Sequence, residues 1–376
     1  MNSYIVDAVR SPIGRKNGTL AAIRGDDLAA QVLNGLLQRN DLDPAAIEDV
    51  QMGCVTQIGE QGWNVGRMAV LAAGWPVSVA ATTVDRQCGS SMQTNFNAAA
   101  AVAAGQLDLV VSAGVEMMSR VPMGSNGGSI SDEVTSRHEI VMQGTSAELL
   151  AKQWGILRDA QDAYALESHR RAIAATDEVR FEREIVRIEV SEGPFEVDEA
   201  PRRDTSLEKL AALAPAFQSD GTVTAGNASQ IVDGAAAVLI ASEDALAAHA
   251  LEPRARFVSF GLAGVDPTRM LHGNPEAIRK ALDRAGLTLD DIGVIEVNEA
   301  FAVVVLQTAA DLGLEERMSD VNPNGGGISL GHPRGATGAR ITATLLPELE
   351  RRGAHYGIAS MCVGFGMAIA AVVERL

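Results

Sequence analysis

Residues 84–94 read VDRQCGSSMQT, and they place one thiol, that of Cys88, where an extended segment turns into a helix. Small residues follow the cysteine at once, and the alanine-rich segment 92–104 has the composition of a helix. A helix N-terminus carries unsatisfied N–H groups and a partial positive charge, and both favour a thiolate over a thiol. Since the thiolate is the nucleophilic form, this position predicts a reactive Cys88. The other interpretation is a small buried hydrophobic residue, which is what most free cysteines are.

The segments around Cys88 alternate between strand and helix patterns. The continuous apolar run 107–114 (LDLVVSAG) is typical of a strand in a sheet that is covered on both faces. Apolar residues in segment 26–38 recur at helical spacing, and a second helix is expected over 63–73, before a glycine and a proline. Further strands are predicted at residues 3–9, 50–55 and 82–85.

The C-terminal third of the chain repeats this plan. Residues 40–50 align with 285–295 on their apolar positions, and residues 105–115 align with 353–363 at a nearly equal offset. Two such matches indicate an internal duplication. We therefore expect two similar α/β halves that pack against each other, at residues 1–118 and 253–376.

The middle segment, residues 119–252, does not fit the repeat. Its first part, up to residue 140, is rich in Ser, Gly and Asn and is expected to be loop. Helices are predicted at 146–154 and 160–175, and residues 181–190 alternate as a strand does. We expect this segment to be a loop domain that covers the site and then returns to the first half.

Composition and charge exclude several classes of protein. The net charge is −17, from 31 basic and 48 acidic side chains, which argues against a nucleic-acid partner. The three cysteines give no disulfide framework and suit a reducing compartment. No apolar run reaches the ~18 residues of a membrane span, and the N-terminus is no signal peptide. A soluble, cytoplasmic protein without a membrane partner is expected.

The glycine-rich segment 322–340, NPNGGGISLGHPRGATGAR, holds His332 between a glycine and a proline. Six glycines in nineteen residues indicate a backbone with unusual torsion angles that packs closely against another segment or a ligand. The Gly-Lys-Ser/Thr ending of a phosphate-binding loop is absent. The favoured interpretation is a rigid loop that presents one imidazole.

Two further segments carry reactive or polar groups. Cys362 stands in MCVGFGMA near a predicted strand end, where a thiol suits general acid–base work, although a packed core cysteine is the alternative. Residues 364–366 resemble the start of a dinucleotide loop but lack its third glycine and the following unit, which disfavours NAD. Asn298 follows strand 293–297 and can orient a water or cap the helix expected at 301–312.

Taken together, these motifs resemble those of the thiolase family over essentially the whole chain. The segments VDRQCGSSMQ, AGNAS, NEAF, NGGGISLGHPRGATGAR and CVGFG occur in the family's order and approximate spacing. The resemblance implies an α/β fold with two duplicated βαβαβαββ halves in a five-layered αβαβα arrangement, plus a loop domain. The duplication found in the sequence is consistent with that fold.

The resemblance also implies roles for the residues. Cys88 is expected to be the acylated nucleophile, His332 to take its proton, and Cys362 to exchange the proton on the α-carbon. One oxyanion hole is expected from Asn298, a water and His332, and another from the backbone N–H groups of Cys88 and Gly364. The positions that match coenzyme A or substrate contacts are Ser229, Arg202, Ala225, Gly226, His272 and Met142.

The implied reaction is the reversible thiolytic cleavage of 3-oxoacyl-CoA by CoA to acyl-CoA and acetyl-CoA, with ping-pong kinetics and a degradative role. Coenzyme A thioesters are then substrates, and no cofactor or metal is expected. The assembly is expected to be a homodimer or a dimer of dimers. Alternatives are a biosynthetic acetoacetyl-CoA thiolase, a decarboxylating condensing enzyme, a non-catalytic acyl-CoA-binding relative, and a metal or redox site.

Overall fold

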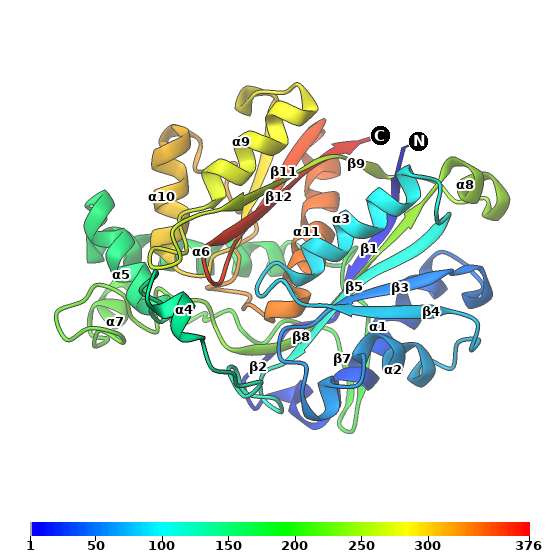
Figure 1. The fold of residues 1–376 in the computed structure, drawn as a ribbon, viewed down its shortest axis with the longest axis horizontal. Coiled ribbons are helices and arrows are strands. Elements are labelled where there is room, and N and C mark those ends of the chain that lie inside the picture. The colour runs from blue at the N-terminus through cyan, green and yellow to red at the C-terminus, as the bar shows by residue number, and fades with distance from the viewer. Residues whose placement is uncertain (1) are drawn as a thin grey trace.

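Two helices, α3 (Ser90–Ala103) and α11 (Thr337–Arg352), lie side by side in the middle of the molecule, between its two halves (Figure 1). The computed structural model describes residues 2–376. The helices approach closely because Gly338 has no side chain, since a Cβ there would stand 2.1 Å from the backbone nitrogen of Met92. Both helices bury their apolar faces in one cluster that also takes side chains from the strands on either side.

The sheet of the first half has the strand order β4-β3-β5-β8-β1. Strands β3 and β4, and β3 and β5, are parallel, whereas β8 runs antiparallel to both β5 and β1. The expected strands are present with small shifts at their ends. Their bounds are β1 (Tyr4–Arg10), β3 (Asp49–Gly53), β4 (Ala80–Val84), β5 (Leu109–Met117) and β8 (Val232–Ala241).

The second half repeats this order as β10-β11-β12-β9. Strands β10 and β11 are parallel, and β12 runs antiparallel to both β11 and β9, which matches β3, β5, β8 and β1 one for one. The duplication predicted from the sequence is therefore confirmed. The two sheets also join, because β1 and β9 pair over two residues of each strand. The bounds are β9 (Ala255–Gly264), β10 (Ile292–Val297), β11 (Tyr356–Val363) and β12 (Met367–Arg375).

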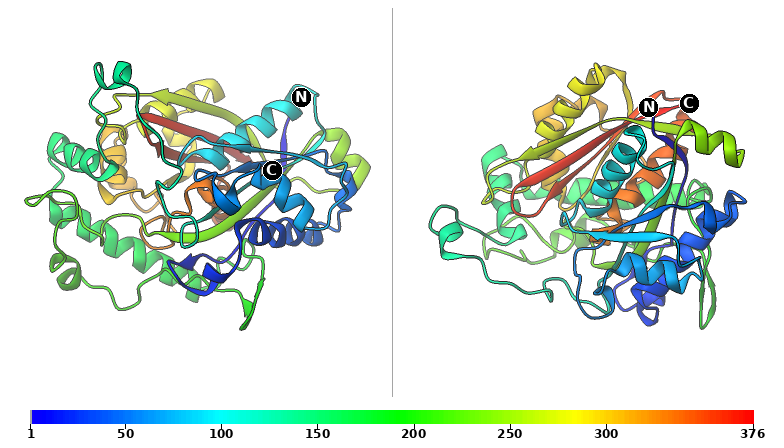
Figure 2. Two further views of the ribbon diagram at one scale, coloured as in Figure 1. Left: turned by 60° about the horizontal axis from the view of Figure 1, so that its bottom comes forward. Right: turned by 45° about the vertical axis from the view of Figure 1, so that its right-hand side comes forward.

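Helices cover the outer face of each half-sheet (Figures 1 and 2). Helices α1 (Gly25–Arg39) and α2 (Val65–Ala72) share an apolar cluster with β3, β5 and β8. Helices α9 (Asn274–Ala285) and α10 (Ala302–Leu312) share another with β10, β11 and β12. Together with α3 and α11 they complete the five-layered αβαβα arrangement that was expected.

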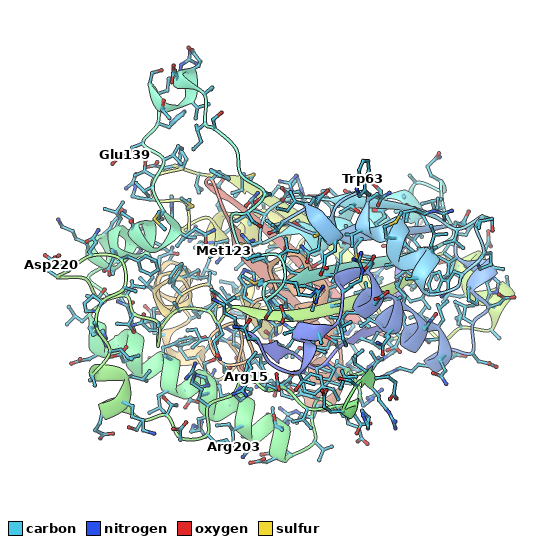
Figure 3. All side chains as sticks on the ribbon, turned by 90° about the horizontal axis from the view of Figure 1, so that it is seen from below. Arg15, Trp63, Met123, Glu139, Arg203 and Asp220 are labelled. Carbon is cyan, nitrogen blue, oxygen red and sulfur yellow. The ribbon has the colours of Figure 1, made fainter. Side chains whose placement is uncertain are left out.

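The excursion between β5 and β8 is only partly as expected. Residues 118–140 are mostly loop, with one short helix, and Figure 3 shows this segment standing away from the body near Glu139. The strand predicted over 181–190 is wrong for residues 181–187. The ring of Phe181 lies 5.0 Å from the Arg10 guanidinium, and the turn at Glu184 bonds the Arg10 backbone, so only the last three residues form a strand.

The remaining elements lie in this excursion or in the connections between strands. They are β2 (Gly14–Arg15), α4 (Asp132–Thr135), α5 (Gln143–Trp154), α6 (Arg158–Asp177), β6 (Ile188–Val190), β7 (Gly193–Phe195), α7 (Leu207–Ala211) and α8 (Glu243–His249).

A buried ion pair fastens the loop domain to β1 and gives a stability prediction. Arg10 is fully buried and donates to both carboxylate oxygens of Asp198, at 2.7 and 2.9 Å, and to Glu184 at 2.5 Å. Asp198→Ala would leave a buried guanidinium without its main partner, so we expect urea unfolding to show a loss of about 3–5 kcal/mol. Asp177→Ala, which breaks an exposed ion pair with Arg203, is the control and should change little. An equal loss of stability in both variants would contradict the stabilising role given to the buried pair of Arg10 and Asp198.

Candidate active site

Cys88 lies at the start of α3, as the sequence predicted, and it is 5% exposed. Gln87, just before it, adopts a left-handed backbone with φ 46°, which turns the chain sharply into the helix. Gly89 then packs directly on the second half, since a Cβ there would stand 2.9 Å from Cγ2 of Val363 and 3.0 Å from Cγ2 of Ile369. This close contact brings the thiol to the end of β11.

Cys362 lies inside β11, which extends to Val363, and it is 1% exposed. The backbone N–H of Gly364 lies close enough to hydrogen-bond the Cys88 sulfur, and the charge of Cys88 acts directly on Cys362. The structure therefore brings Cys88, Cys362 and Gly364 together from the two halves of the chain.

The helix start alone does not decide the charge of Cys88. Burial raises the pKa of the Cys88 thiol above its ordinary value, and this outweighs Arg334 and the backbone N–H groups of Cys88 and Gly364, which lower it. The pKa of the Cys362 thiol is raised as well, first by burial and then by the neighbouring Cys88. Both groups are thiols at neutral pH, so nucleophilic attack by Cys88 needs a base.

The imidazole of His332 is held by its own loop. Its Nδ1 lies 2.6 Å from the hydroxyl oxygen of Thr337, which itself donates to the carbonyl of Pro333 at 3.0 Å. The hydroxyl is therefore the acceptor for Nδ1–H, and Nε2 carries the free lone pair. Burial, with the charges of Arg334 and Arg340, lowers the pKa of His332 to about 3, so the ring is neutral.

Asn298 faces this free nitrogen. Its Nδ2 lies 3.4 Å from Nε2 of His332, and its backbone N–H donates to the carbonyl of Ser360 on β11 at 2.9 Å. It does not cap α10, because the capping residue is Phe301. Its Oδ1 is buried and has no hydrogen-bond partner among residues 2–376. A buried acceptor of this kind suits a water or a polar substrate group.

Three of the expected coenzyme A contacts line one pocket. Arg202, Ala225 and Gly226 border a hollow of about 200 Å³, together with Gln230. The carbonyl of Gln230 accepts from the backbone N–H of His332 at 3.2 Å, so this pocket adjoins the imidazole loop. Ser229 is not part of its lining, although it is the residue before Gln230 and its backbone donates to the carbonyl of Ala300.

A second hollow of about 450 Å³ shares Arg202, Asp204 and Gln230 with the first. It adds the guanidinium groups of Arg15 and Arg203, which Figure 3 labels. Its lining holds three arginines against two carboxylates, Glu199 and Asp204, and Arg203 is already paired with Asp177. Arginine guanidinium groups are suited to phosphate groups.

The two remaining predicted contacts, Met142 and His272, do not line either of these hollows. Met142 precedes α5 and is 72% exposed, whereas the next residue, Gln143, holds its Nε2 3.5 Å from a Cβ built on Gly364. The ring of His272 turns to Trp154, at 6.2 Å between centroids, and its Nδ1 contacts the Arg269 carbonyl. The side chains of the same turn that share an apolar cluster with Cys362 are Met270 and Leu271.

Sequence reasoning missed Thr337 and Gln143. Thr337 carries a signal that is readable in retrospect, since it is a hydroxyl five residues after His332 in the same glycine-rich loop. No comparable signal marks Gln143, because its position beside Gly364 arises only from the packing of α5 on the end of β11.

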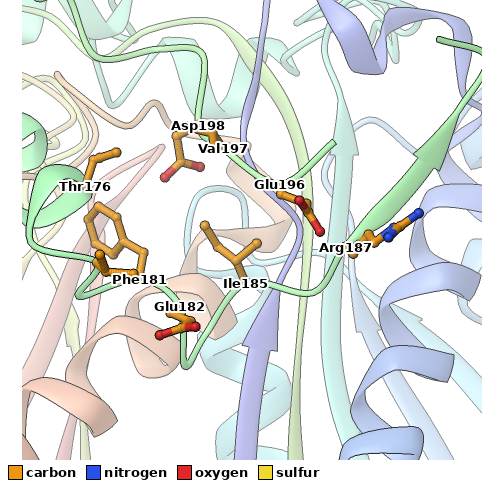
Figure 4. Close-up of a pocket in the computed structure, with 9 residues that line it drawn as sticks. Thr176, Phe181, Glu182, Ile185, Arg187, Glu196, Val197 and Asp198 are labelled. Atoms are coloured by element: carbon orange, nitrogen blue, oxygen red, sulfur yellow. The ribbon is translucent and has the colours of Figure 1, made fainter. Parts of the chain in front are cut away.

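Another hollow, of about 350 Å³, is shown in Figure 4 and has no part in this chemistry. Its lining includes Thr176, Phe181, Ile185 and Asp198, and it holds no thiol, imidazole or amide. Asp198 is already paired with Arg10. In residues 2–376 no group of three or more His, Cys, Asp or Glu side chains is arranged to hold a metal ion, and the three cysteines are free and buried.

Comparison with known proteins agrees with this site. The family models described as "Thiolase, N-terminal domain" and "Thiolase, C-terminal domain" match residues 3–244 and 251–375. The chain is 45% identical to the steroid 3-ketoacyl-CoA thiolase FadA6 of Mycobacterium tuberculosis, over 100% of this chain and 94% of that protein. It is 46% identical to the 3-ketoacyl-CoA thiolase of Aliivibrio fischeri, over 100% and 99%.

A solved structure gives the same answer for the fold. The acetyl-CoA acetyltransferase of Bacillus anthracis superposes with a TM-score of 0.92 at 41% identity, over 100% of this chain and 99% of that one. Among the described residues, no helix is long and apolar enough to cross a membrane. Both halves of the chain and its motifs match one family throughout, and the chain therefore belongs to the thiolase family of acyltransferases.

Proposed function

We propose that the protein cleaves 3-oxoacyl-CoA with CoA, giving acetyl-CoA and an acyl-CoA, through an acyl group carried on Cys88. The observation that supports the proposal is that Cys88 and Cys362, two thiols from different halves of the chain, act electrostatically on each other, with the Gly364 N–H at Cys88. An imidazole–amide pair, His332 and Asn298, is the second support. Two thiols with separate tasks are what a reaction needs when it both attacks a carbonyl and moves a proton at carbon.

In the first step, His332 takes the proton of Cys88 and the sulfur attacks the 3-oxo carbonyl carbon. A neutral ring whose free nitrogen is fixed by Thr337 is suited to accept that proton. The bond between the second and third carbons then breaks. The acyl group stays on Cys88 as a thioester, and the electron pair leaves as the enolate of acetyl-CoA.

In the same half-reaction, the thiol of Cys362 gives its proton to the second carbon of the enolate, and acetyl-CoA departs. CoA then transfers its thiol proton to the Cys362 thiolate and attacks the acyl-Cys88 thioester. The bond between Cys88 and the acyl carbon breaks, which releases acyl-CoA. The Cys88 thiolate takes back the proton that His332 had accepted, so both thiols and the neutral imidazole are restored. The burial that raises the pKa of the Cys362 thiol suits a group that must return a proton to carbon.

Two groups of donors stabilise the negative oxygens in this scheme. The N–H groups of Cys88 and Gly364 serve the tetrahedral oxygen on the Cys88 side, and each preorganised donor of this kind contributes roughly 3–4 kcal/mol. The enolate oxygen accepts from Nε2–H of His332, which by then carries the proton taken from Cys88, and from a water held by Asn298. The partnerless Oδ1 of Asn298 supports the water, because a buried acceptor needs a donor.

The coenzyme A arm enters along the two hollows that meet at Arg202 and Gln230. Arg202, with Arg15 and Arg203 nearby, binds the phosphate groups, and Ala225 and Gly226 line the pantetheine path towards His332, with Ser229 behind them as the neighbour of Gln230. His272 and Met142 border the mouth of the site, with Gln143 facing its interior. No cofactor beyond the CoA thioester substrates is needed.

The names of similar proteins, which include 3-ketoacyl-CoA thiolases, favour the degradative direction over the condensation of two acetyl-CoA. We propose a cytoplasmic enzyme, since three cysteines without a disulfide fit a reducing compartment.

We also propose a homodimer or a dimer of dimers. Strand β4 is an edge of the sheet, and Trp63 nearby in the chain is 91% exposed, features that a second copy would cover.

The function is tested by a thiolysis assay on 3-oxoacyl-CoA esters of increasing acyl length, followed by the loss of enolate absorbance. We expect CoA-dependent cleavage of several esters, with parallel lines in double-reciprocal plots, because the acyl-enzyme separates the two half-reactions. Turnover of acetoacetyl-CoA alone would favour the biosynthetic alternative. Binding of acyl-CoA without any turnover would instead favour a non-catalytic relative.

A further inference from the structure

Arg334 is a buried cation near the start of α3, where Cys88 lies, and the proposed reaction gives it no role. Arg334 is 7% exposed and begins the single turn η6 (Arg334–Ala336), two residues after His332. One guanidinium nitrogen, Nη2, donates to the hydroxyl of Thr56 at 2.8 Å. Its Nε is buried and has no hydrogen-bond partner in the described part of the chain. A partnerless N–H on a buried cation indicates that the charge serves a nearby anion.

The turn that carries Arg334 is wedged against the start of α3. A Cβ on Gly53 would stand 2.4 Å from the backbone nitrogen of Ser91 and 2.7 Å from the carbonyl oxygen of Gly335. A Cβ on Gly114 would stand 2.4 Å from that same oxygen. The backbone N–H of Gly335 also donates to Glu116 at 2.8 Å. The guanidinium is therefore held at a fixed place relative to the helix start that bears Cys88.

The other titratable groups near Cys88 are of all three kinds, anionic, neutral and, in Arg86, cationic: the backbone of Arg86 bridges to that of Cys88, and its Nε is buried without a hydrogen-bond partner in the described part of the chain. Glu116, on β5, is fully buried, and its carboxylate accepts from Gly335 and from the backbone of Val55 and Thr56. Its charge raises the pKa of the Cys88 thiol, as burial does, whereas the charge of Arg334 lowers it. The exposed Asp85 and the neutral groups Cys54, His332 and Cys362 also lie in these surroundings. Of the two arginines, Arg334 is the one whose charge lowers the pKa of Cys88, against the effects of burial and Glu116.

We propose that Arg334 is a positioning residue for the nucleophile, whose fixed guanidinium stabilises the thiolate of Cys88 at the moment the proton leaves. This inference rests on the proposed role of Cys88. The same charge makes His332 a weaker base, so the imidazolium gives its proton back to the Cys88 sulfur when the acyl group leaves, instead of keeping it. Arg334 touches no reacting atom in this scheme and acts only through Cys88 and His332.

The test measures the alkylation of Cys88 by iodoacetamide as a function of pH, read on the Cys88 peptide by mass spectrometry. Arg334→Gln removes the charge, and Arg334→Lys keeps it on a side chain of similar reach. We expect Arg334→Gln to slow alkylation at pH 7 by roughly fivefold to tenfold and to move the midpoint of the curve to higher pH. Arg334→Lys should restore most of the wild-type curve. Arg170→Gln, an exposed arginine on α6, controls for net charge.

Equal curves for Arg334→Gln and the wild-type enzyme, or equal shifts for the Gln and Lys variants, would overturn the inference. A merely structural role would lower the melting temperature without separating Lys from Gln. If Arg334→Gln does not fold, Arg334→Met fills the same volume without a charge and replaces it. Acylation of the wild-type enzyme by an acyl-CoA is run in parallel. If Cys88 takes up no acyl group, the proposed function fails; if it does and the curves coincide, only this inference fails.

Discussion

Replacing Cys88 by alanine is expected to abolish acyl transfer, with a loss of at least about 10⁴-fold in thiolysis, and to remove covalent labelling by acyl-CoA. The effect is large because no other sulfur in the site is placed to attack. The thiol of Cys88 stands at the start of α3 with the Gly364 N–H beside it, whereas Cys362 lies inside β11. Incubation with acetyl-CoA, followed by mass spectrometry of the intact protein and its peptides, measures the acyl group directly.

Cys54→Ala is the matched control for this loss. Cys54 is a buried free cysteine in the same half, and it belongs to the apolar cluster beneath β3. The control variant should take up one acyl group on Cys88, as the wild-type enzyme does. An acyl group found on Cys54 or Cys362 of the wild-type enzyme would refute Cys88 as the nucleophile.

The fold was largely predictable because its strands are apolar runs of the kind that a covered sheet requires. The run at 107–114 became β5 (Leu109–Met117), every residue of which is buried. The repeat predicted the same order in both halves, since duplicated halves keep their pairing. The strand over 181–190 failed because the alternation there comes from residues that pack around the buried Arg10, and a long-range ion pair leaves no local pattern.

The site was predictable as a set of residues but not in its electrostatics. A helix start is visible in the sequence, and it suggested a thiolate at Cys88. The cost of desolvation is not visible there, because it depends on what covers the thiol after folding, and in the structure burial outweighs the helix start. The position of Arg334 could not be predicted either. In the sequence it is one residue of a glycine-rich motif, and only the folded turn η6 shows that it lies against the end of β3.

The roles proposed for the two thiols, whose pKa values are both raised by burial, can be tested separately. Cys362→Ala is expected to keep the acylation of Cys88 by an acyl-CoA, because that half-reaction uses His332 and the Gly364 N–H. It should lose condensation and thiolysis by about 10²–10⁴-fold, the usual contribution of a general acid or base. The exchange of the methyl protons of acetyl-CoA with deuterated water, followed by NMR, isolates this step, and it should disappear.

Ser360→Ala is the matched control, since Ser360 lies two residues earlier on the same face of β11 and its hydroxyl bonds only Asn274 and a strand carbonyl. That variant should retain the exchange. If Cys362→Ala still exchanges the methyl protons, the base at the α-carbon is another group. If instead Cys362→Ala and Cys88→Ala are equally unable to take up an acyl group, the two thiols act as one unit in acylation, and the separate roles given to them are wrong.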